Sequence, residues 1–277
     1  MDSNTSQTAN ESNDLRRDRA AGLAVGIGGW VDTHGHIQLT EDPPEHVLEH
    51  GTAGVDWLVA PGVDLASSEA SMRLERAYPG RVMSSAGLHP HDAASWPKVR
   101  DQITELAAQA AAVGETGLDF YRNLAPRDAQ IEAFTDHVRM AHDLGKPLIV
   151  HCRDAFAEVH DILAASDPGP WMVLHCWTGG PRWTKRFLEL DVTFSFAGPV
   201  AFEAGDTVRR GAAVVPPNHA VVETDTPYLS PPPFRGEVNV PSRVALVGAA
   251  LARVWGMEVV DVARLTSSNA ARVFRDG

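Results

Sequence analysis

Cysteine, basic charge and long apolar runs are all scarce in this sequence of 277 residues. Its two cysteines are too few for a disulfide framework, which points to a reducing compartment. No run approaches the roughly 18 consecutive apolar residues that a membrane-spanning helix needs, so no membrane partner is expected. The 24 basic residues against 36 acidic ones give a formal charge of −12, which argues against a broad electrostatic surface for nucleic acid. Nucleic acid is still allowed as a substrate, because bound metal ions would add positive charge locally.

The N-terminal residues have little that could form a core. Residues 1–19 are polar and rich in Ser, Asn and Asp, which predicts a disordered tail ahead of one folded domain over residues 20–277. Arginines followed by the apolar run Ala20–Trp30 superficially resemble an export signal. That run contains four glycines and leads directly into the first predicted strand, so its removal would damage the fold. We therefore expect a cytoplasmic protein.

Short β-rich runs alternate with helical patterns along the rest of the chain. The clearest helix begins near Pro126, ends at Leu144 and is followed by Gly145, and two more span about Pro241–Trp255 and Val259–Phe274. The predicted strands are Trp30–Thr33, Val55–Ala60, Val82–Leu88, Ala111–Glu115, Leu148–His151, Met172–His175, Val192–Phe196 and Ala220–Glu223. Strict alternation predicts an α/β fold with a parallel sheet, and eight units predict a single-domain (β/α)₈ TIM barrel. A doubly wound open sheet is the alternative.

Polar side chains gather at the carboxyl ends of the predicted strands, where barrel enzymes build their active sites. In an extended chain alternate side chains share a face, so His34 and His36 can point at one ion. The candidate metal ligands are His34, His36, Glu115, His151, His175 and Asp225. Each alone has an ordinary explanation, such as a hydrogen bond or a turn. Together, four imidazoles and two carboxylates suit two divalent cations with Glu115 bridging them.

Six motifs occur in order along the chain. They are Asp-Thr-His-x-His from residue 32, Gly-Leu-His-Pro-His from 87, Gly-Glu-x-Gly-Leu-Asp from 114, His-Cys-Arg from 151, His-Cys-Trp-Thr-Gly from 175 and Glu-Thr-Asp-x-Pro from 223. This series resembles the TatD family of metal-dependent deoxyribonucleases, which belong to the amidohydrolase-like barrels. The resemblance runs from about residue 30 to the C-terminus. It implies a cytoplasmic exonuclease that removes nucleotides from DNA ends, with some family members also acting on RNA.

The resemblance also implies a division of the metal ligands. It assigns one cation to His34, His36 and Asp225, the other to His151 and His175, and places Glu115 between them. We expect Asp225 to orient the attacking water and take its proton. The imidazoles favour Zn²⁺ or Mn²⁺ by affinity and Mg²⁺ prefers oxygen ligands, so the identity of the two cations stays open.

Three residues are candidates for substrate binding. The resemblance implies that His89 contacts substrate phosphate, and the charge of Arg153 makes it a candidate for a second phosphate contact. Trp177 either stacks on a base or forms part of the barrel wall. Trp177 also departs from the family, which often has Phe there, as does the acidic, proline-containing loop Glu41–Glu45. These departures leave the ligands intact and affect substrate preference.

Two rival functions remain at this stage. A barrel hydrolase of a small amide, ester, lactone or phosphoester would use the same metal chemistry, but the Gly-Glu-x-Gly-Leu-Asp context of Glu115 argues against it. A non-catalytic metal-binding protein would be expected to lack ligands, and none is missing. No obligate protein partner is evident. Cys152 and Cys176 directly follow ligand histidines, and we expect buried free thiols facing the helical layer rather than a disulfide.

Overall fold

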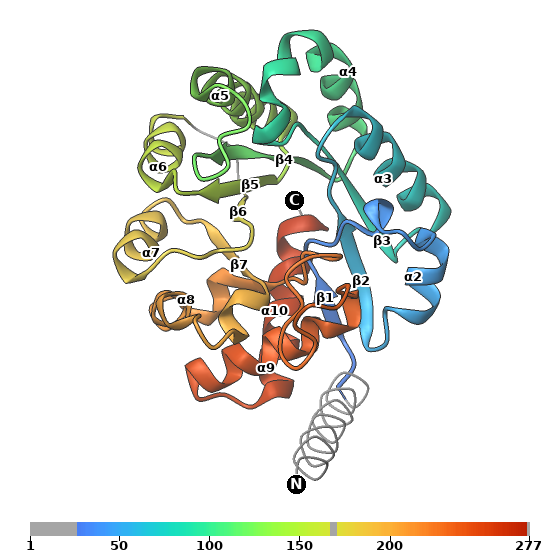
Figure 1. The fold of residues 1–277 in the computed structure, drawn as a ribbon, viewed down its shortest axis with the longest axis vertical. Helices are drawn as coiled ribbons and strands as arrows, with labels where there is room; N and C mark the ends of the chain where they lie inside the picture. The colour runs from blue at the N-terminus through green and yellow to red at the C-terminus, as the bar shows by residue number, and fades with distance from the viewer. Residues whose placement is uncertain (1–26, 167–170, 276–277) are drawn as a thin grey trace, which may run out of the picture.

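The computed structural model describes residues 27–166 and 171–275. Strands and helices alternate along the chain, and the helices surround the strands (Figure 1). The strands are β1 (Trp30–Asp32), β2 (Val55–Ala60), β3 (Val82–Ala86), β4 (Ala112–Asp119), β5 (Leu148–Arg153), β6 (Met172–Leu174), β7 (Thr193–Phe196) and β8 (Ala220–Val222). The α-helices are α2 (Pro44–His50), α3 (Leu65–Ala77), α4 (Trp96–Gln109), α5 (Arg127–Leu144), α6 (Phe156–Ala165), α7 (Pro181–Leu188), α8 (Asp206–Ala212), α9 (Val244–Trp255) and α10 (Val259–Phe274). Short 3-10 helices are η1 (Ile37–Leu39), η2 (Pro90–Ser95), η3 (Gly198–Ala201), η4 (Pro217–His219) and η5 (Pro241–Arg243).

The eight strands are parallel and neighbour one another in chain order from β1 to β8. The first and last strands are joined where Thr33 N donates to Val222 O at 3.0 Å and where Gly35 and Thr226 form a parallel bridge. A doubly wound sheet would instead reverse its strand order at a switch point. The predicted (β/α)₈ barrel is therefore confirmed. The predicted tail, residues 1–19, lies outside the described residues, as does most of the signal-like run that follows it.

The interior of the barrel is apolar at the end where the strands begin. Side chains from β1, β5, β6 and β8 pack there against α10, which passes across this end of the ring (Figure 1). The contributing side chains include Val31, Ile149, Val173, Val221, Ala270, Val273 and Phe274. Because this end is filled, the polar residues that follow the strands are left to line the opposite, carboxyl end.

Several element boundaries differ from the sequence prediction. β4 continues past Glu115 to Asp119 because Gly117–Asp119 stays paired with His151–Arg153 of β5. β6 stops at Leu174, one residue before its histidine. The helix α5 ends as predicted, with Gly145 in the left-handed conformation at φ 63°. In the part of the chain that the structure describes, no helix combines the length and apolar character of a membrane span.

Candidate metal centre

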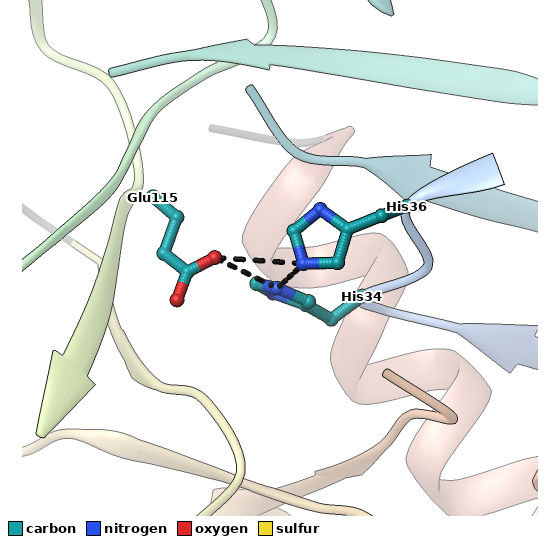
Figure 2. A group of neighbouring side chains, drawn as sticks. All are labelled: His34, His36 and Glu115. Atoms are coloured by element: carbon teal, nitrogen blue, oxygen red, sulfur yellow. Dashed lines mark hydrogen bonds and ion pairs between the residues drawn. The ribbon is translucent and has the colours of Figure 1, made fainter. Parts of the chain in front are cut away.

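Two histidines and a glutamate form the first half of the site. His34 and His36 follow β1, Glu115 lies within β4, and all three are buried. The Nε2 atoms of the histidines are 3.1 Å apart, and Glu115 Oε2 lies 3.2 Å from that of His34 and 3.6 Å from that of His36. Figure 2 shows both rings turning a nitrogen toward the carboxylate. Asp225 also lies beside this group, with its Oδ1 3.5 Å from His36 Nε2.

The other oxygen of the same carboxylate faces the second half of the site. Glu115 Oε1 lies 3.0 Å from His151 Nδ1 and 3.0 Å from His175 Nε2, and these two nitrogens are 3.2 Å apart. Glu115 is therefore the centre of the cluster, with one oxygen toward each pair of histidines. The structure brings all six residues of the predicted ligand set into one connected group.

The donor set fits divalent cations. Ligand atoms at the 2.0–2.1 Å typical of tetrahedral zinc sites are about 3.3 Å from one another, close to the spacings here. His34, His36 and Glu115 form one group with mutually close ligand atoms, and His34, His175 and Asp225 form another. Facing imidazole nitrogens in a buried site repel unless a proton or a cation lies between them. These residues can therefore hold metal ions.

Glu223 orients His175 from behind. His175 Nδ1 lies 3.1 Å from Glu223 Oε1, Cys176 N donates to the same oxygen at 2.8 Å, and Ser195 Oγ donates to the other oxygen. A carboxylate that accepts the Nδ1 proton leaves the Nε2 lone pair of His175 free to bind a cation. Despite the opposing effect of burial, the charges of Glu115 and Glu223 raise the pKa of His175 well above its ordinary value.

Asp119 plays the same part for His151. Its Oδ2 lies 3.3 Å from His151 Nε2 and 2.9 Å from His91 Nε2, and its Oδ1 accepts from Arg122 N at 2.7 Å. Burial opposes ionisation, but the hydrogen bonds from His151, Arg122 and His91 lower the pKa of Asp119 below its ordinary value. Neither Asp119 nor Glu223 was among the predicted site residues. Asp119 belongs to the motif around Glu115, and Glu223 to the motif around Asp225. Their acidic side chains at the ends of strands were the sequence feature that could have identified them as site residues.

The backbone places Asp225 beside the first histidine pair. Asp225 N donates to His34 O at 2.8 Å, and the residue adopts the left-handed region at φ 57°, which Asp tolerates better than most residues. The preceding Thr224 is fixed by the buried Asp32, whose Oδ1 accepts from Thr224 N at 2.8 Å. Burial raises the pKa of Asp32 to about 8. Asn239 Nδ2 donates to Thr224 O at 2.9 Å from the other side.

His89 is a hydrogen-bond donor toward the site. Its Nδ1 accepts from His91 N at 3.2 Å, so neutral His89 carries its proton on Nε2, which points at Glu115 Oε1 from 3.5 Å. Burial lowers the pKa of His89 well below its ordinary value, which keeps it neutral. A protonated Nε2 does not bind a cation, so we separate His89 from the metal ligands although it lies near Glu115 and His151.

A cavity of about 650 Å³ opens above these residues. Every residue of the cluster except the fully buried His34 contributes to its floor, and residues from the carboxyl ends of the strands and the loops after them form its rim. The rim residues are Leu39, Val63, His91, Asp92, Arg122, Arg153, Thr178, Pro199, Tyr228 and Leu229. A substrate that enters this cavity meets the candidate ligands directly.

Residues 31–275 match the family model of the TatD related DNases. The chain belongs to the TatD family. It is 38% identical to the uncharacterized metal-dependent hydrolase YcfH of Escherichia coli (strain K12), an alignment that covers 88% of this chain and 95% of that one. It is 32% identical to the 3'-5' ssDNA/RNA exonuclease TatD of Pectobacterium parmentieri (strain WPP163), with 86% and 95% covered. The crystal structure of YJJV, a TatD homologue from Escherichia coli k12, superposes with a TM-score of 0.80 at 24% identity, covering 88% of this chain and 97% of that one.

In this TatD family member the predicted substrate contacts lie in different environments. Arg153 is exposed on the rim with its guanidinium 4.1 Å from the centre of the Tyr121 ring. Trp177 is 2% exposed, donates from Nε1 to Thr184 Oγ1 at 3.0 Å and packs edge-on against Phe187. The placement of Trp177 supports the alternative of a barrel-wall residue and leaves no free face for a base.

The two cysteines are free thiols, as expected, but they differ in position. Cys152 is buried within the apolar core and Cys176 is only half-buried, and both contribute to the lining of the cavity. The expectation that both thiols face the helical layer is wrong for Cys176. That expectation extended the strand alternation beyond Leu174, where β6 ends, and Cys176 instead takes a turn conformation with φ 45°.

Proposed function

We propose that this TatD family member is a metal-dependent exonuclease that hydrolyses phosphodiester bonds at the ends of single-stranded DNA and RNA. The observation that carries the proposal is the convergence of four imidazoles on the two oxygens of Glu115 at the floor of an open cavity. The similarity to the 3'-5' ssDNA/RNA exonuclease of Pectobacterium supports the substrate class, and the metal-dependent hydrolases among the relatives support the chemistry. We also propose a cytoplasmic location.

Two divalent cations, of zinc, manganese or magnesium, complete the proposed site. His34, His36 and Asp225 would hold one cation and His151 and His175 the other, and Glu115 lies between the two groups. When bound, the cations lower the pKa of water toward neutrality and offset negative charge on the phosphoryl oxygens. Glu115 links the two halves of the site, because its carboxylate contacts all four histidines.

The remaining steps belong to side chains of the chain itself. Asp225 accepts a proton from the attacking water as the new oxygen–phosphorus bond forms. His89 donates its Nε2 proton in a hydrogen bond to a non-bridging phosphoryl oxygen, which stabilises the charge that develops there. The bond from phosphorus to the leaving nucleoside oxygen then breaks, and that oxygen takes a proton from solvent.

The test follows release of nucleotides from end-labelled DNA. The purified protein is stripped with a chelator and given Mg²⁺, Mn²⁺ or Zn²⁺ separately, with single-stranded DNA labelled at either end and a His151→Ala variant as control. Metal-restored release that the variant lacks supports the exonuclease and identifies the end attacked. If cations bind but DNA stays intact while bis(p-nitrophenyl) phosphate or a small ester is hydrolysed, the small-substrate alternative replaces the proposal. If no cation binds, the metal assignment fails.

A further inference from the structure

The rim of the cavity is chemically uneven. On the side of β8 and η3 it is apolar or aromatic, with Pro199, Tyr228 and Leu229. On the side of η2 it carries the exposed carboxylate of Asp92. Among the described residues that line the cavity, Arg122 and Arg153 supply all the arginine and lysine side chains. Arg122 lies in the loop after β4, and Arg153 is the last residue of the neighbouring strand β5. Positive charge on this rim is therefore confined to one sector.

These two guanidinium groups are available to an anion. Both residues are exposed, and within residues 27–166 and 171–275 neither forms an ion pair with a carboxylate. In a chain of net charge −12, arginines elsewhere do pair, as Arg210 does with Asp206 at 3.1 Å. Two arginines without acidic partners beside an active-site cavity are a suitable site for phosphate.

Tyr121 precedes Arg122 in the chain and adds an aromatic ring beside Arg153, just outside the residues that line the cavity. Its side chain is 63% exposed, and the Arg153 guanidinium lies 4.1 Å from its ring centre. The segment is fixed to the barrel, because Phe120 N donates to Arg153 O at 2.9 Å and Arg122 N donates to Asp119 Oδ1 at 2.7 Å. An exposed aromatic ring on an anchored segment, with adjacent cations, is an arrangement that binds single-stranded nucleic acid without reading its sequence.

We propose that Tyr121, Arg122 and Arg153 form the subsite for the nucleotides next to the one being removed. Their phosphates contact the two guanidinium groups and one base stacks on Tyr121, so the strand leaves the active site over β4 and β5. The inference rests on the proposed exonuclease function. It requires single-stranded substrate, since a base paired in a duplex does not present its face to Tyr121.

The experiment measures binding of a fluorescent, phosphorothioate-protected oligothymidylate to the metal-loaded protein by anisotropy, with oligomers of two to eight nucleotides. The variants are Tyr121→Ala, Tyr121→Phe, Arg122→Ala and Arg153→Ala. The matched control for the arginine variants is Arg127→Ala, because Arg127 is also exposed and stacks on Phe120 at 4.0 Å but, unlike Arg122 and Arg153, does not line the cavity. Thermal unfolding of each variant establishes that it is folded.

For the octamer we expect binding about 10-fold weaker with Tyr121→Ala and with each arginine variant, recovery with Tyr121→Phe, and no change with Arg127→Ala. The dimer, which extends least beyond the cleaved bond, should lose less affinity than the octamer. If folded Tyr121→Ala and Arg122→Ala bind the octamer as the unmodified protein does, the subsite is wrong, although metal-dependent cleavage still stands. If the unmodified protein neither binds nor cleaves oligonucleotides, the proposed function fails together with the subsite.

Discussion

The floor and the rim of the cavity are built in opposite ways. On the floor, Glu115 and His175 are buried, and nearly every polar atom faces another polar group of the chain. On the rim, Arg122 is exposed, and so is the adjacent Tyr121. A buried network tolerates little change because an unpaired polar group there is costly, whereas an exposed rim can be altered residue by residue. We infer that the floor fixes the chemistry and the rim selects the substrate.

The strongest test of this contrast is Asp225→Asn on the floor. An amide does not accept the proton of the attacking water, so we expect turnover to fall about 1,000-fold, within the range for a lost general base. Binding of a protected oligonucleotide should change only a few-fold, because Asp225 acts on the water. Single-turnover cleavage and anisotropy measure the two effects separately, and the bound metal content is checked in parallel. Near-normal turnover with bound metal would remove Asp225 from its assigned role.

The second test is Glu223→Gln, which leaves all proposed ligands in place. Glu223 accepts from His175, Cys176 and Ser195. A neutral amide keeps the shape of the side chain but removes the negative charge that faces His175 Nδ1. We expect metal affinity to fall about 10–100-fold, as for other carboxylates that orient a metal-binding histidine. Titrating activity against buffered free metal should show a shifted midpoint, with activity recovered at high metal concentration. A loss that no metal concentration restores would indicate a direct role in the reaction instead.

The sequence predicted the fold and grouped the ligands because both depend on local patterns. His34, His36 and Glu115 stand at strand ends in short motifs, and parallel strands bring such ends together. The orienting carboxylates were not assigned, because the pairings of Asp119 with His151 and of Glu223 with His175 depend on how neighbouring strands are placed.

Two other assignments needed the three-dimensional contacts. The sequence left Trp177 undecided between a base-stacking and a wall position, and Thr184 and Phe187 of the following helix surround it in the structure. Cys176 was placed on the wrong side because strand alternation stops at Leu174. Tyr121 and Arg122 belong to the loop after β4, where no periodicity indicates which side chains face the cavity.

The third test concerns His137 of α5, which contacts the backbone of Leu88, the residue before His89. This buried histidine accepts from Leu88 N at 3.2 Å through Nε2, and its Nδ1 donates to Ala133 O at 2.7 Å. Burial lowers the pKa of His137 to about 4, and the nearby charge of Asp136 only partly opposes this. The unfolded chain therefore takes up a proton near pH 6.5 that the folded protein takes up only near 4.

Stability should consequently fall as the pH drops from about 6.5 to about 4, by about 3 kcal/mol for this group, and no further below that. The measurement is urea unfolding of the unmodified protein and of His137→Gln at pH 7 and pH 4.5. Glutamine can replace both hydrogen bonds but does not titrate, so the variant should lose less stability between the two pH values. An equal loss in both proteins would show that other groups account for the pH dependence.

The smallest expected effect is on the salt dependence of oligonucleotide binding, which distinguishes the charge of the rim arginines from their shape. Each phosphate neutralised on a single strand contributes about 0.7 to the slope of log affinity against log salt concentration. Arg122→Ala should reduce that slope by about this amount, and Arg153→Lys should leave it unchanged because the charge remains. Arg153→Lys should nevertheless weaken binding a few-fold, because a lysine ammonium lacks the planar face that stacks on Tyr121. Anisotropy titrations from low to high salt give both numbers, and an unchanged slope in Arg122→Ala would mean that this guanidinium does not contact phosphate.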